Sequence, residues 1–391
     1  MTERLNDLLV EEADGLDVPA PPAGAILHRA RGLRRRRQGL VGIAAAAAAV
    51  VAIGGVAALT GGDSGTAADP AATTGSAPTF TVGTTLYFGD GHTAEIDDKA
   101  VKSIYYTSAG VLVRHGNNSW SDGGGPQRFS LVSPDGTVHP LGLVTEETVH
   151  ATDPAQPYVV YGQNVDGTLQ LVVYDVTADR EAARVDVGDT KGNWFPVALD
   201  GDTAYVQDGY DGDTYAVQWR TGDVGPSDLS SIWEVAGGHA TSASAGHLEV
   251  TDLATGKTLL DVAANGSLDL SPDGRFAIVV DEDAGMSGKP TPSDVYDVAT
   301  GSHVSVPGAA YDWGWTADGD LFKVAGGKLT TCDSVTGDCA TTDVDVPDSD
   351  GAQNEPACPV RIGKHGEAST GDCEPAPDPA EVRLGGRVYE S

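Results

Sequence analysis

The stretch Ser267–Pro307 constrains the fold more than any other part of the chain. It contains four short segments with the apolar content and the turn residues of antiparallel strands. Ser271–Gly274 suits the first turn and Gly301 suits the last one, because glycine tolerates a positive φ. Four strands in about 40 residues form a sheet that cannot bury its own faces, so it needs neighbours of the same kind. The predicted strands are Ser267–Leu270, Arg275–Asp281, Ser293–Val298 and Ser302–Val306.

Both turns of this stretch recur along the chain. The matches to the first turn are Ser133–Gly136, Val165–Gly167, Leu199–Gly201 and Thr316–Gly319. The matches to the second turn, Tyr296–Gly301, are Tyr174–Asp179, Thr251–Gly256 and Cys332–Gly337. A mean spacing of about 40 residues is the period of four-stranded propeller blades.

The repeated unit, Ser-Pro-Asp-Gly, an apolar strand and then Tyr/Thr-Asp-x-Ala-Thr-Gly, resembles the WD40 and related surface-propeller repeats over about 164–346. Its Tyr-Asp and Thr-Asp pairs stand where those repeats place Trp-Asp, whereas their Gly-His near the start of a blade has no counterpart. The resemblance implies an all-β, six- to seven-bladed β-propeller over 79–348, with seven blades favoured. A β-sandwich is the alternative, but it does not explain the period. The expected blades lie near 84–145, 150–190, 192–228, 230–264, 265–309 and 310–346, and the first is long enough to include ring-closing strands.

The N-terminal region predicts one transmembrane α-helix before the propeller. Gly39–Leu59 carries no charge over 21 residues, and a helix of that length spans roughly 30 Å. Arg34–Arg37 flank its N-terminal end, so residues 1–38 are expected to form a cytoplasmic tail with the bulk of the chain outside. Thr60–Pro78 has the composition of a flexible linker. A cleaved export signal, including one of twin-arginine type, and a buried soluble helix are the alternatives.

The tail itself resembles the cytoplasmic leaders of actinobacterial single-span membrane proteins. Residues 1–37 contain a leucine-bearing helical segment, a proline break at 18–22 and then an arginine block. The resemblance implies a single-pass protein in the cell membrane.

Charge is distributed unevenly along the chain. The formal net charge is −33, yet residues 1–38 hold seven arginines and six acidic residues. The remainder therefore carries 51 acidic and 17 basic residues. Such an acidic body is repelled by nucleic acid, because binding to phosphates requires Lys and Arg. No nucleic-acid partner is expected.

The four cysteines all lie near the C-terminus, beyond the predicted membrane span, where disulfides are permitted. Cys332 and Cys339 flank a hairpin turn that brings their Cα atoms within bonding range. That pair leaves Cys358 with Cys373, which would staple the segment 349–391. A four-cysteine zinc site is the alternative, although the spacings fit it poorly. A last strand within Glu381–Tyr389 would close the ring or pack on its rim.

Motifs for catalysis and for cofactors are sparse. Ser242–Gly246 falls one residue short of a nucleophile elbow, and the histidines show no metal-binding spacing. The acidic loops Asp208–Asp213 and Asp343–Asp350 have ligands for calcium but do not match its motif. We therefore predict no catalytic residue, no metal and no cofactor. The candidate binding residues, with packing between blades as the alternative role, are Tyr311, Asp312, Trp313 and Trp315.

These features favour a membrane-anchored, extracytoplasmic propeller that binds an envelope protein, peptide or glycan. Two alternatives are a propeller enzyme of lactonase or glycan-cleaving type, and a transmembrane sensor that signals through the N-terminal tail. Fold alone does not choose among these functions.

Overall fold

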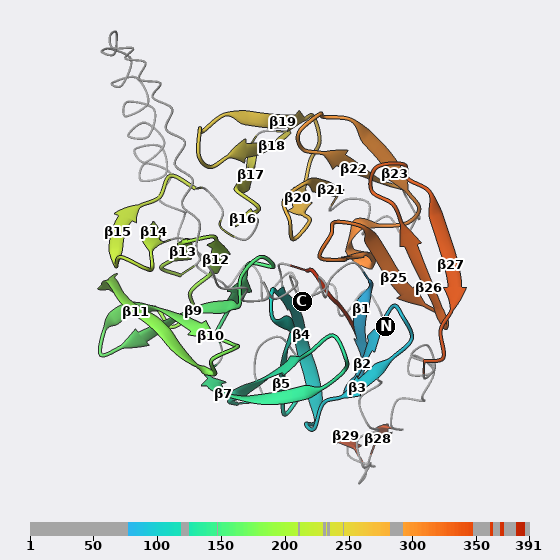
Figure 1. The fold of residues 1–391 in the computed structure, drawn as a ribbon, viewed down its shortest axis with the longest axis horizontal. Coiled ribbons are helices and arrows are strands. Elements are labelled where there is room, and N and C mark those ends of the chain that lie inside the picture. Colours follow the sequence, from blue (N-terminus) through green and yellow to red (C-terminus); the bar gives the residue numbers. More distant parts are fainter. Residues whose placement is uncertain are drawn as a thin grey trace, which may run out of the picture. The chain divides into compact units, whose positions relative to one another are not determined.

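Seven four-stranded antiparallel sheets stand around a central axis in the computed structural model (Figure 1). The chain divides into two compact units, 1–66 and 67–391, and every described residue belongs to the second. The predicted all-β propeller is confirmed, and it has seven blades. The structure describes residues 77–118, 125–146, 148–209, 212–229, 232, 235–244, 246–281, 292–346, 360–362, 368–370 and 381–387.

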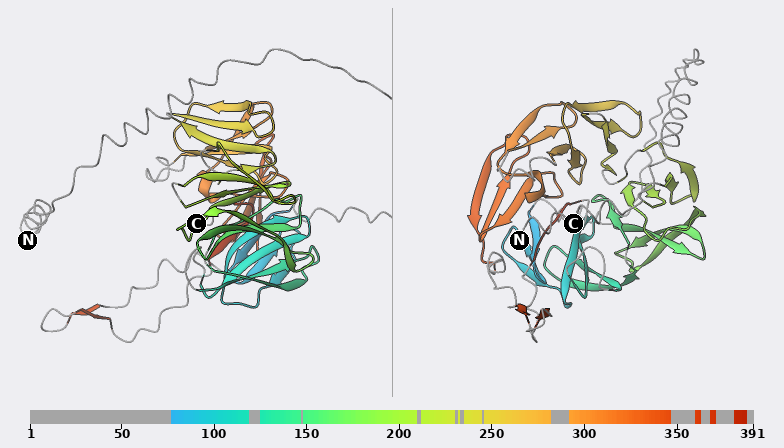
Figure 2. Two further views of the ribbon diagram at one scale, coloured as in Figure 1. Left: turned by 90° about the vertical axis from the view of Figure 1, so that its left-hand side faces the viewer. Right: turned by 180° about the vertical axis from the view of Figure 1, so that it is seen from behind.

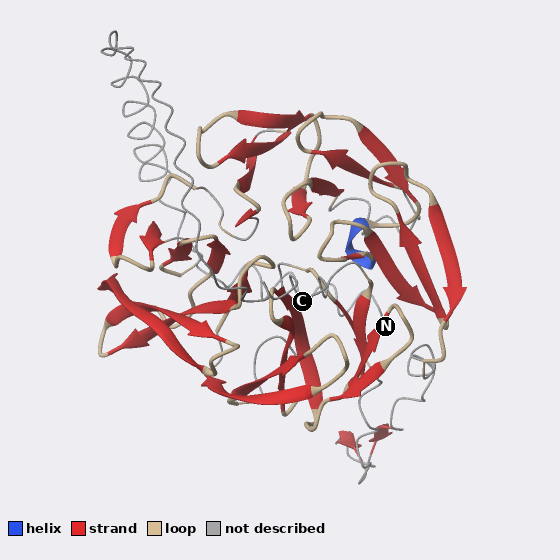
Figure 3. Ribbon diagram, viewed as in Figure 1, coloured by secondary structure: helices blue, strands red, loops and turns tan. Residues whose placement is uncertain are grey.

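The strands follow the chain around the ring, each blade starting at its innermost strand (Figure 3). Blade one comprises β4 (Ala100–Thr107), β5 (Gly110–Gly116), β6 (Gln127–Val132) and β7 (Val138–Thr145). Blade two comprises β8 (His150–Thr152), β9 (Tyr158–Val165), β10 (Thr168–Asp175) and β11 (Arg180–Asp189). Blade three comprises β12 (Val197–Asp200), β13 (Thr203–Gln207), β14 (Thr214–Gln218) and β15 (Asp223–Pro226). Blade four comprises β16 (Val235–Ala236), β17 (His239–Ser244), β18 (His247–Asp252) and β19 (Thr258–Val262).

The remaining blades complete the circle. Blade five comprises β20 (Ser267–Leu270), β21 (Phe276–Val280), β22 (Ser293–Asp297) and β23 (His303–Val306). The short 3-10 helix η1 (Ala310–Asp312) leads into blade six, which comprises β24 (Gly314–Trp315), β25 (Leu321–Ala325), β26 (Lys328–Cys332) and β27 (Cys339–Asp343). Blade seven comprises β30 (Val382–Leu384), β1 (Thr79–Val82), β2 (Thr85–Phe88) and β3 (Thr93–Glu95). A separate two-stranded sheet pairs β28 (Val360–Ile362) with β29 (Ala368–Thr370).

Blade seven closes the ring with strands from both ends of the described chain. β30 is the innermost strand and pairs antiparallel with β1, so that Phe80 lies opposite Leu384. The backbone N–H of Gly385 donates to the carbonyl of Thr79 at 2.9 Å. These bonds cover the inner edge of β1, so strands from the two ends of the described chain form one sheet that closes the ring. The views from the side and from behind show the sheets facing one another around the axis (Figure 2).

The hydrophobic core is divided among the contacts between blades. Each of seven buried clusters in the described residues joins one blade to the next around the ring. On β21, Phe276 and Ile278 pack toward blade six, whereas Ala277 packs toward blade four. A strand that is buried on both faces shows this alternation, and the stretch Ser267–Pro307 therefore depends on both neighbours for its stability.

The four strands predicted in this stretch are β20 to β23, with ends that coincide or differ by one residue. Gly274 has a φ of +70° in the first turn, which is the positive value expected for a glycine at this position. The aspartate of the second turn has a structural role. One side-chain oxygen of Asp297 accepts the backbone N–H of Thr300 at 2.8 Å, and Asp175, Asp252 and Asp333 make the same kind of bond in blades two, four and six. The repeated Tyr/Thr-Asp signature therefore marks the turn before the outermost strand.

Two of the matches to the first turn occupy other positions in their blades. Ser133–Gly136 joins the third strand of blade one to the fourth, and Val165–Gly167 joins the second strand of blade two to the third. Leu199–Gly201 and Thr316–Gly319 lie between the first two strands, as in blade five. An aspartate followed by glycine suits any tight hairpin, so its position within a blade cannot be inferred from the turn alone.

Several predictions fall outside the described residues. These are the tail 1–38, the span Gly39–Leu59, nearly all of the linker Thr60–Pro78, and the cysteines Cys358 and Cys373. In the part of the chain that the structure describes, no helix is long and apolar enough to cross a membrane. The predicted disulfide between Cys332 and Cys339 is formed, and the two residues face each other across β26 and β27.

Candidate functional site

A pocket of about 370 Å³ opens where blades one, six and seven meet. A volume of this size lies within the range of small-molecule sites, roughly 300–1,000 Å³. Its wall combines an inner strand from each of blades one and seven with the second strand of blade six. The lining residues are Lys102–Ile104, Lys323–Ala325, Val382–Leu384, Tyr311, Asp312 and Arg387.

The charge of this pocket is opposite to that of the protein. Four of its lining residues are basic, and Asp312 is the one acidic residue among them. Basic residues are scarce in the chain beyond residue 38, where acidic residues outnumber them by 51 to 17. Clustered like charges raise the electrostatic free energy of the folded state, so their presence indicates a site for negative charge. We call this site the cationic pocket. Its basic residues are Lys102, Lys323, Arg383 and Arg387.

Lys323 projects from β25 toward the loop before η1. Its ammonium donates to the carbonyl oxygen of Pro307 at 3.0 Å. It also lies 4.4 Å from the centre of the Trp313 ring, within the range of a cation–π contact. The indole of Trp313 is buried and fixed in the core between blades five and six. This aromatic support holds the ammonium in a defined place at the pocket.

The two arginines lie on the other side of the pocket, Arg383 within β30 and Arg387 just after it. A guanidinium nitrogen of Arg387 donates to the backbone carbonyl of Tyr311, and one of Arg383 lies 3.0 Å from a carboxylate oxygen of Glu381. Burial lowers the pKa of both arginines, and in Arg387 the nearby carboxylates Asp269 and Asp312 act in the opposite direction. Partly desolvated guanidinium groups gain more from a bound anion than fully hydrated ones do.

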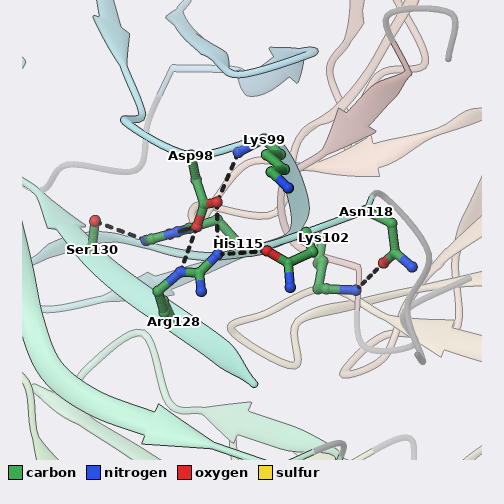
Figure 4. A network of polar contacts seen from close by, with 8 residues as sticks. Asp98, Lys99, Lys102, His115, Asn118, Arg128 and Ser130 are labelled. Carbon is green, nitrogen blue, oxygen red and sulfur yellow. Dashed lines mark hydrogen bonds and ion pairs between the residues drawn. The ribbon is translucent and has the colours of Figure 1, made fainter. Parts of the chain in front are cut away.

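Lys102 reaches the pocket from the start of β4. It is only 1% exposed, and its ammonium donates to the side-chain oxygen of Asn118 at 2.6 Å (Figure 4). The Cβ of an alanine at position 116 would lie 2.9 Å from the Lys102 side chain, so Gly116 leaves the room that the lysine occupies.

A buried ionic network holds the beginning of β4 in place (Figure 4). Asp98 lies just before β4, and its carboxylate accepts two hydrogen bonds from Arg128, at 2.8 and 2.7 Å, and contacts Nδ1 of His115 at 2.6 Å. Burial by itself raises the pKa of Asp98, but the hydrogen bonds from Arg128 and His115 outweigh it and lower the pKa to about 2. The carboxylate is therefore ionised at neutral pH and ties the loop before β4 to β5 and β6.

The same histidine completes an Asp–His–Ser arrangement, since its Nε2 lies 3.0 Å from Oγ of Ser130. Hydrolases use this order of groups for nucleophilic attack. Here, however, Ser130 is 3% exposed and does not line the cationic pocket. A substrate has no route to its hydroxyl, so we interpret the network as a structural link between strands.

The predicted binding residues divide into two pairs. Tyr311 and Asp312 are exposed and line the cationic pocket. Trp313 and Trp315 are at most 1% exposed and belong to the core between blades five and six. The two tryptophans therefore pack between blades, which was the alternative role for this cluster, and they support the pocket from the side of the core.

Sequence reasoning missed the four basic residues of the pocket. Lys102, Lys323 and the pair Arg383 and Arg387 come from three separate parts of the chain and converge only when blade seven closes beside blade one. One signal was available, because each lysine or arginine is conspicuous in a body with so few of them. The other weak candidates do not assemble into a site. Ser242 and Ser244 lie on a strand, not in an elbow, and no group of three or more His, Cys, Asp or Glu residues among the described ones has the geometry to hold a metal ion.

Comparisons with known proteins add no functional identity. No family model and no curated protein matches the chain. Among solved structures, apo AztD from Citrobacter koseri is 12% identical, over 69% of this chain and 95% of its own, with a TM-score of 0.44. A putative 6-phosphogluconolactonase from Bacteroides fragilis is 16% identical, over 71% and 98%, with a TM-score of 0.41. TolB from Acinetobacter baumannii is 11% identical, over 71% and 65%, with a TM-score of 0.38.

Likenesses this distant carry no argument about the ligand. The assignment of the fold instead follows from the chain's own sheets, their closure and the repeated turns. On that evidence the protein is a seven-bladed β-propeller.

Proposed function

We propose that this protein is a membrane-anchored, extracytoplasmic binding module that holds an envelope protein, peptide or glycan at the cationic pocket. The observation that carries the proposal is the convergence of four basic residues on one pocket of a strongly acidic chain. The lining supplies positive charge and N–H donors from three blades, which is chemistry suited to holding and orienting a ligand. The rigid ring around it lowers the entropy lost on binding.

The anchored, extracytoplasmic location has separate support. Gly39–Leu59 is long enough to span the hydrocarbon layer, and the arginine block lies on its N-terminal side. The disulfide between Cys332 and Cys339 is typical of an oxidising compartment. A sensor function would depend on residues 1–38, which lie outside the described residues.

Site-specific photo-cross-linking tests the binding role. A cross-linking amino acid at Ala325, an exposed residue of the pocket wall, should capture an envelope component in living cells. The matched control carries the same amino acid at Val224, which is 37% exposed on the outer strand of blade three. Equal capture from both positions, or capture from Val224 alone, would contradict a binding site at the pocket.

Labelling of intact cells tests the location. Lys257 is an exposed lysine in the last turn of blade four. A membrane-impermeant amine reagent should modify it without lysis if the propeller lies outside. Modification that appears only after lysis would place the propeller in the cytoplasm and remove this part of the proposal.

A further inference from the structure

The loop between blades four and five contains the one asparagine in the sequence that is followed by glycine, Asn265. This loop joins β19 to β20, the innermost strand of blade five (Figure 1). We propose that Asn265 is a site of covalent modification, at which the side-chain amide is lost and an isoaspartyl linkage to Gly266 forms. The modification does not depend on the proposed function, because the cationic pocket lies at blades one, six and seven.

The side chain of Asn265 is exposed and makes no hydrogen bond with any described residue. Asn164, which is also exposed, provides the contrast within the same chain. Its Nδ2 donates to the carbonyl of Gly192 at 2.7 Å, and its Oδ1 accepts the backbone N–H of Gly167 at 2.9 Å. Those two bonds fix the amide of Asn164, whereas Asn265 keeps the freedom to rotate its amide carbon toward the following backbone nitrogen.

The fold requires a glycine at position 266. Its φ is +115°, and a Cβ there would lie 2.0 Å from the carbonyl oxygen of Val280. A side chain at this position is therefore excluded by both the backbone conformation and the close approach of β21. Without a Cβ, the backbone nitrogen of Gly266 is not shielded, and none of the described residues accepts a hydrogen bond from its N–H. The nucleophile for the reaction is thus accessible because of the way in which blade five begins.

The reaction needs water as its only co-reactant. The backbone nitrogen of Gly266 loses its proton to solvent and attacks Cγ of Asn265, so that an N–Cγ bond forms. The Cγ–Nδ2 bond breaks, and Nδ2 takes up a proton and leaves as ammonia. Water then opens the cyclic imide at one of its two carbonyl carbons. Opening at the original backbone carbonyl gives isoaspartate, and opening at Cγ gives aspartate, with no change of oxidation state in either case.

Isoaspartate inserts an extra backbone atom and a negative charge directly before β20. Ser267 begins this strand and pairs with Val280 of β21. As the innermost strand, β20 has hydrogen-bonded pairing with β21 alone, so no second strand holds its start in register. We therefore expect the extra atom to loosen the first pair of this ladder, whereas ordinary aspartate at position 265 adds the charge and leaves the backbone unchanged.

Peptide mapping by mass spectrometry tests the modification on the folded, full-length chain. The protein is incubated at pH 8 in water labelled with heavy oxygen, which enters the new carboxylate and separates deamidation from isomerisation of aspartates. We expect labelled isoaspartate, in excess of labelled aspartate, at position 265. Asn164 should stay unlabelled over the same time, because its amide is held and the next residue is the β-branched Val165. Asn265→Gln should abolish labelling of this peptide, because its longer side chain cannot form the five-membered ring.

Native-state hydrogen exchange measures the effect on blade five. Exchange in β20 should be faster in the aged protein than in fresh protein, and freshly prepared Asn265→Asp should match fresh protein. The site is overturned if Asn265 stays unlabelled in the folded chain while the same peptide is converted in urea, or if Asn164 and Asn265 are labelled equally. Equal exchange in aged and fresh protein would overturn the predicted loosening of β20.

Discussion

The substitution Asp98→Asn tests how much the buried network before β4 stabilises the ring. The Asp98 side chain is 6% exposed, and its pKa falls from 3.8 to about 2 in the folded protein. Each unit of pKa shift corresponds to about 1.4 kcal/mol, so the carboxylate contributes roughly 2 kcal/mol to the free energy of unfolding at pH 7. Asparagine keeps the size of the side chain but loses this charge-dependent contribution, and it leaves Arg128 and His115 without their anion.

The pH dependence is the sharper part of this prediction. Because folding lowers the pKa of an acid here, the stabilisation is complete above about pH 4 and is lost as the pH falls toward 2. Urea unfolding followed by tryptophan fluorescence should show a gap of roughly 2 kcal/mol between wild type and Asp98→Asn at pH 7, and roughly half of it at pH 3.

The adjacent, exposed Asp97 provides the matched control. Asp97→Asn should change the free energy of unfolding by less than about 0.5 kcal/mol at either pH, as surface substitutions usually do. The reasoning is refuted if Asp98→Asn costs no more than Asp97→Asn at pH 7. It is also refuted if the gap between wild type and Asp98→Asn stays the same at pH 3, because the cost would then not come from the ionised carboxylate.

Three further predictions concern stability. Replacing Cys332 and Cys339 together by alanine should lower the free energy of unfolding by about 2 kcal/mol in urea denaturation, since the bond closes a short loop. Gly274 and Gly301 share a φ of +70°, but a Cβ at Gly274 would lie 2.3 Å from a backbone carbonyl of blade four, while one at Gly301 meets nothing within 4 Å. Gly301→Ala should cost about 1 kcal/mol and Gly274→Ala at least about 2 kcal/mol more in chemical denaturation, and equal costs would contradict the close approach. Burial raises the pKa of Asp269 to about 6, so its stabilising protonated form is lost as the pH rises through 6. The free energy of unfolding of Asp269→Asn should therefore rise relative to that of wild type between pH 5 and pH 8. A difference between the two proteins that stays constant over this range would argue against this.

The sequence by itself determined the architecture of the propeller. Phe276 and Ile278 alternate with Ala277, and the turn residues at 271–274 and 299–301 delimit the strands, so the strand ends of one blade could be predicted to within one residue. These signals are local, because the alternation of side chains and the φ of a turn glycine are properties of adjacent residues. The pairing of Cys332 with Cys339 was predictable for the same reason, since a single hairpin joins them.

Only the tertiary structure decided the site. Lys102 and Arg387 are separated by nearly the whole propeller domain, and no repeat or spacing relates them. They meet because β30 pairs with β1 and places blade seven beside blade one. The tertiary structure also decided the roles of Tyr311 and Trp313. They lie two residues apart on one segment, yet Tyr311 faces the pocket and Trp313 faces the core between blades. Local sequence specifies each thin sheet, whereas contacts at the closure of the ring depend on the positions of all seven blades together.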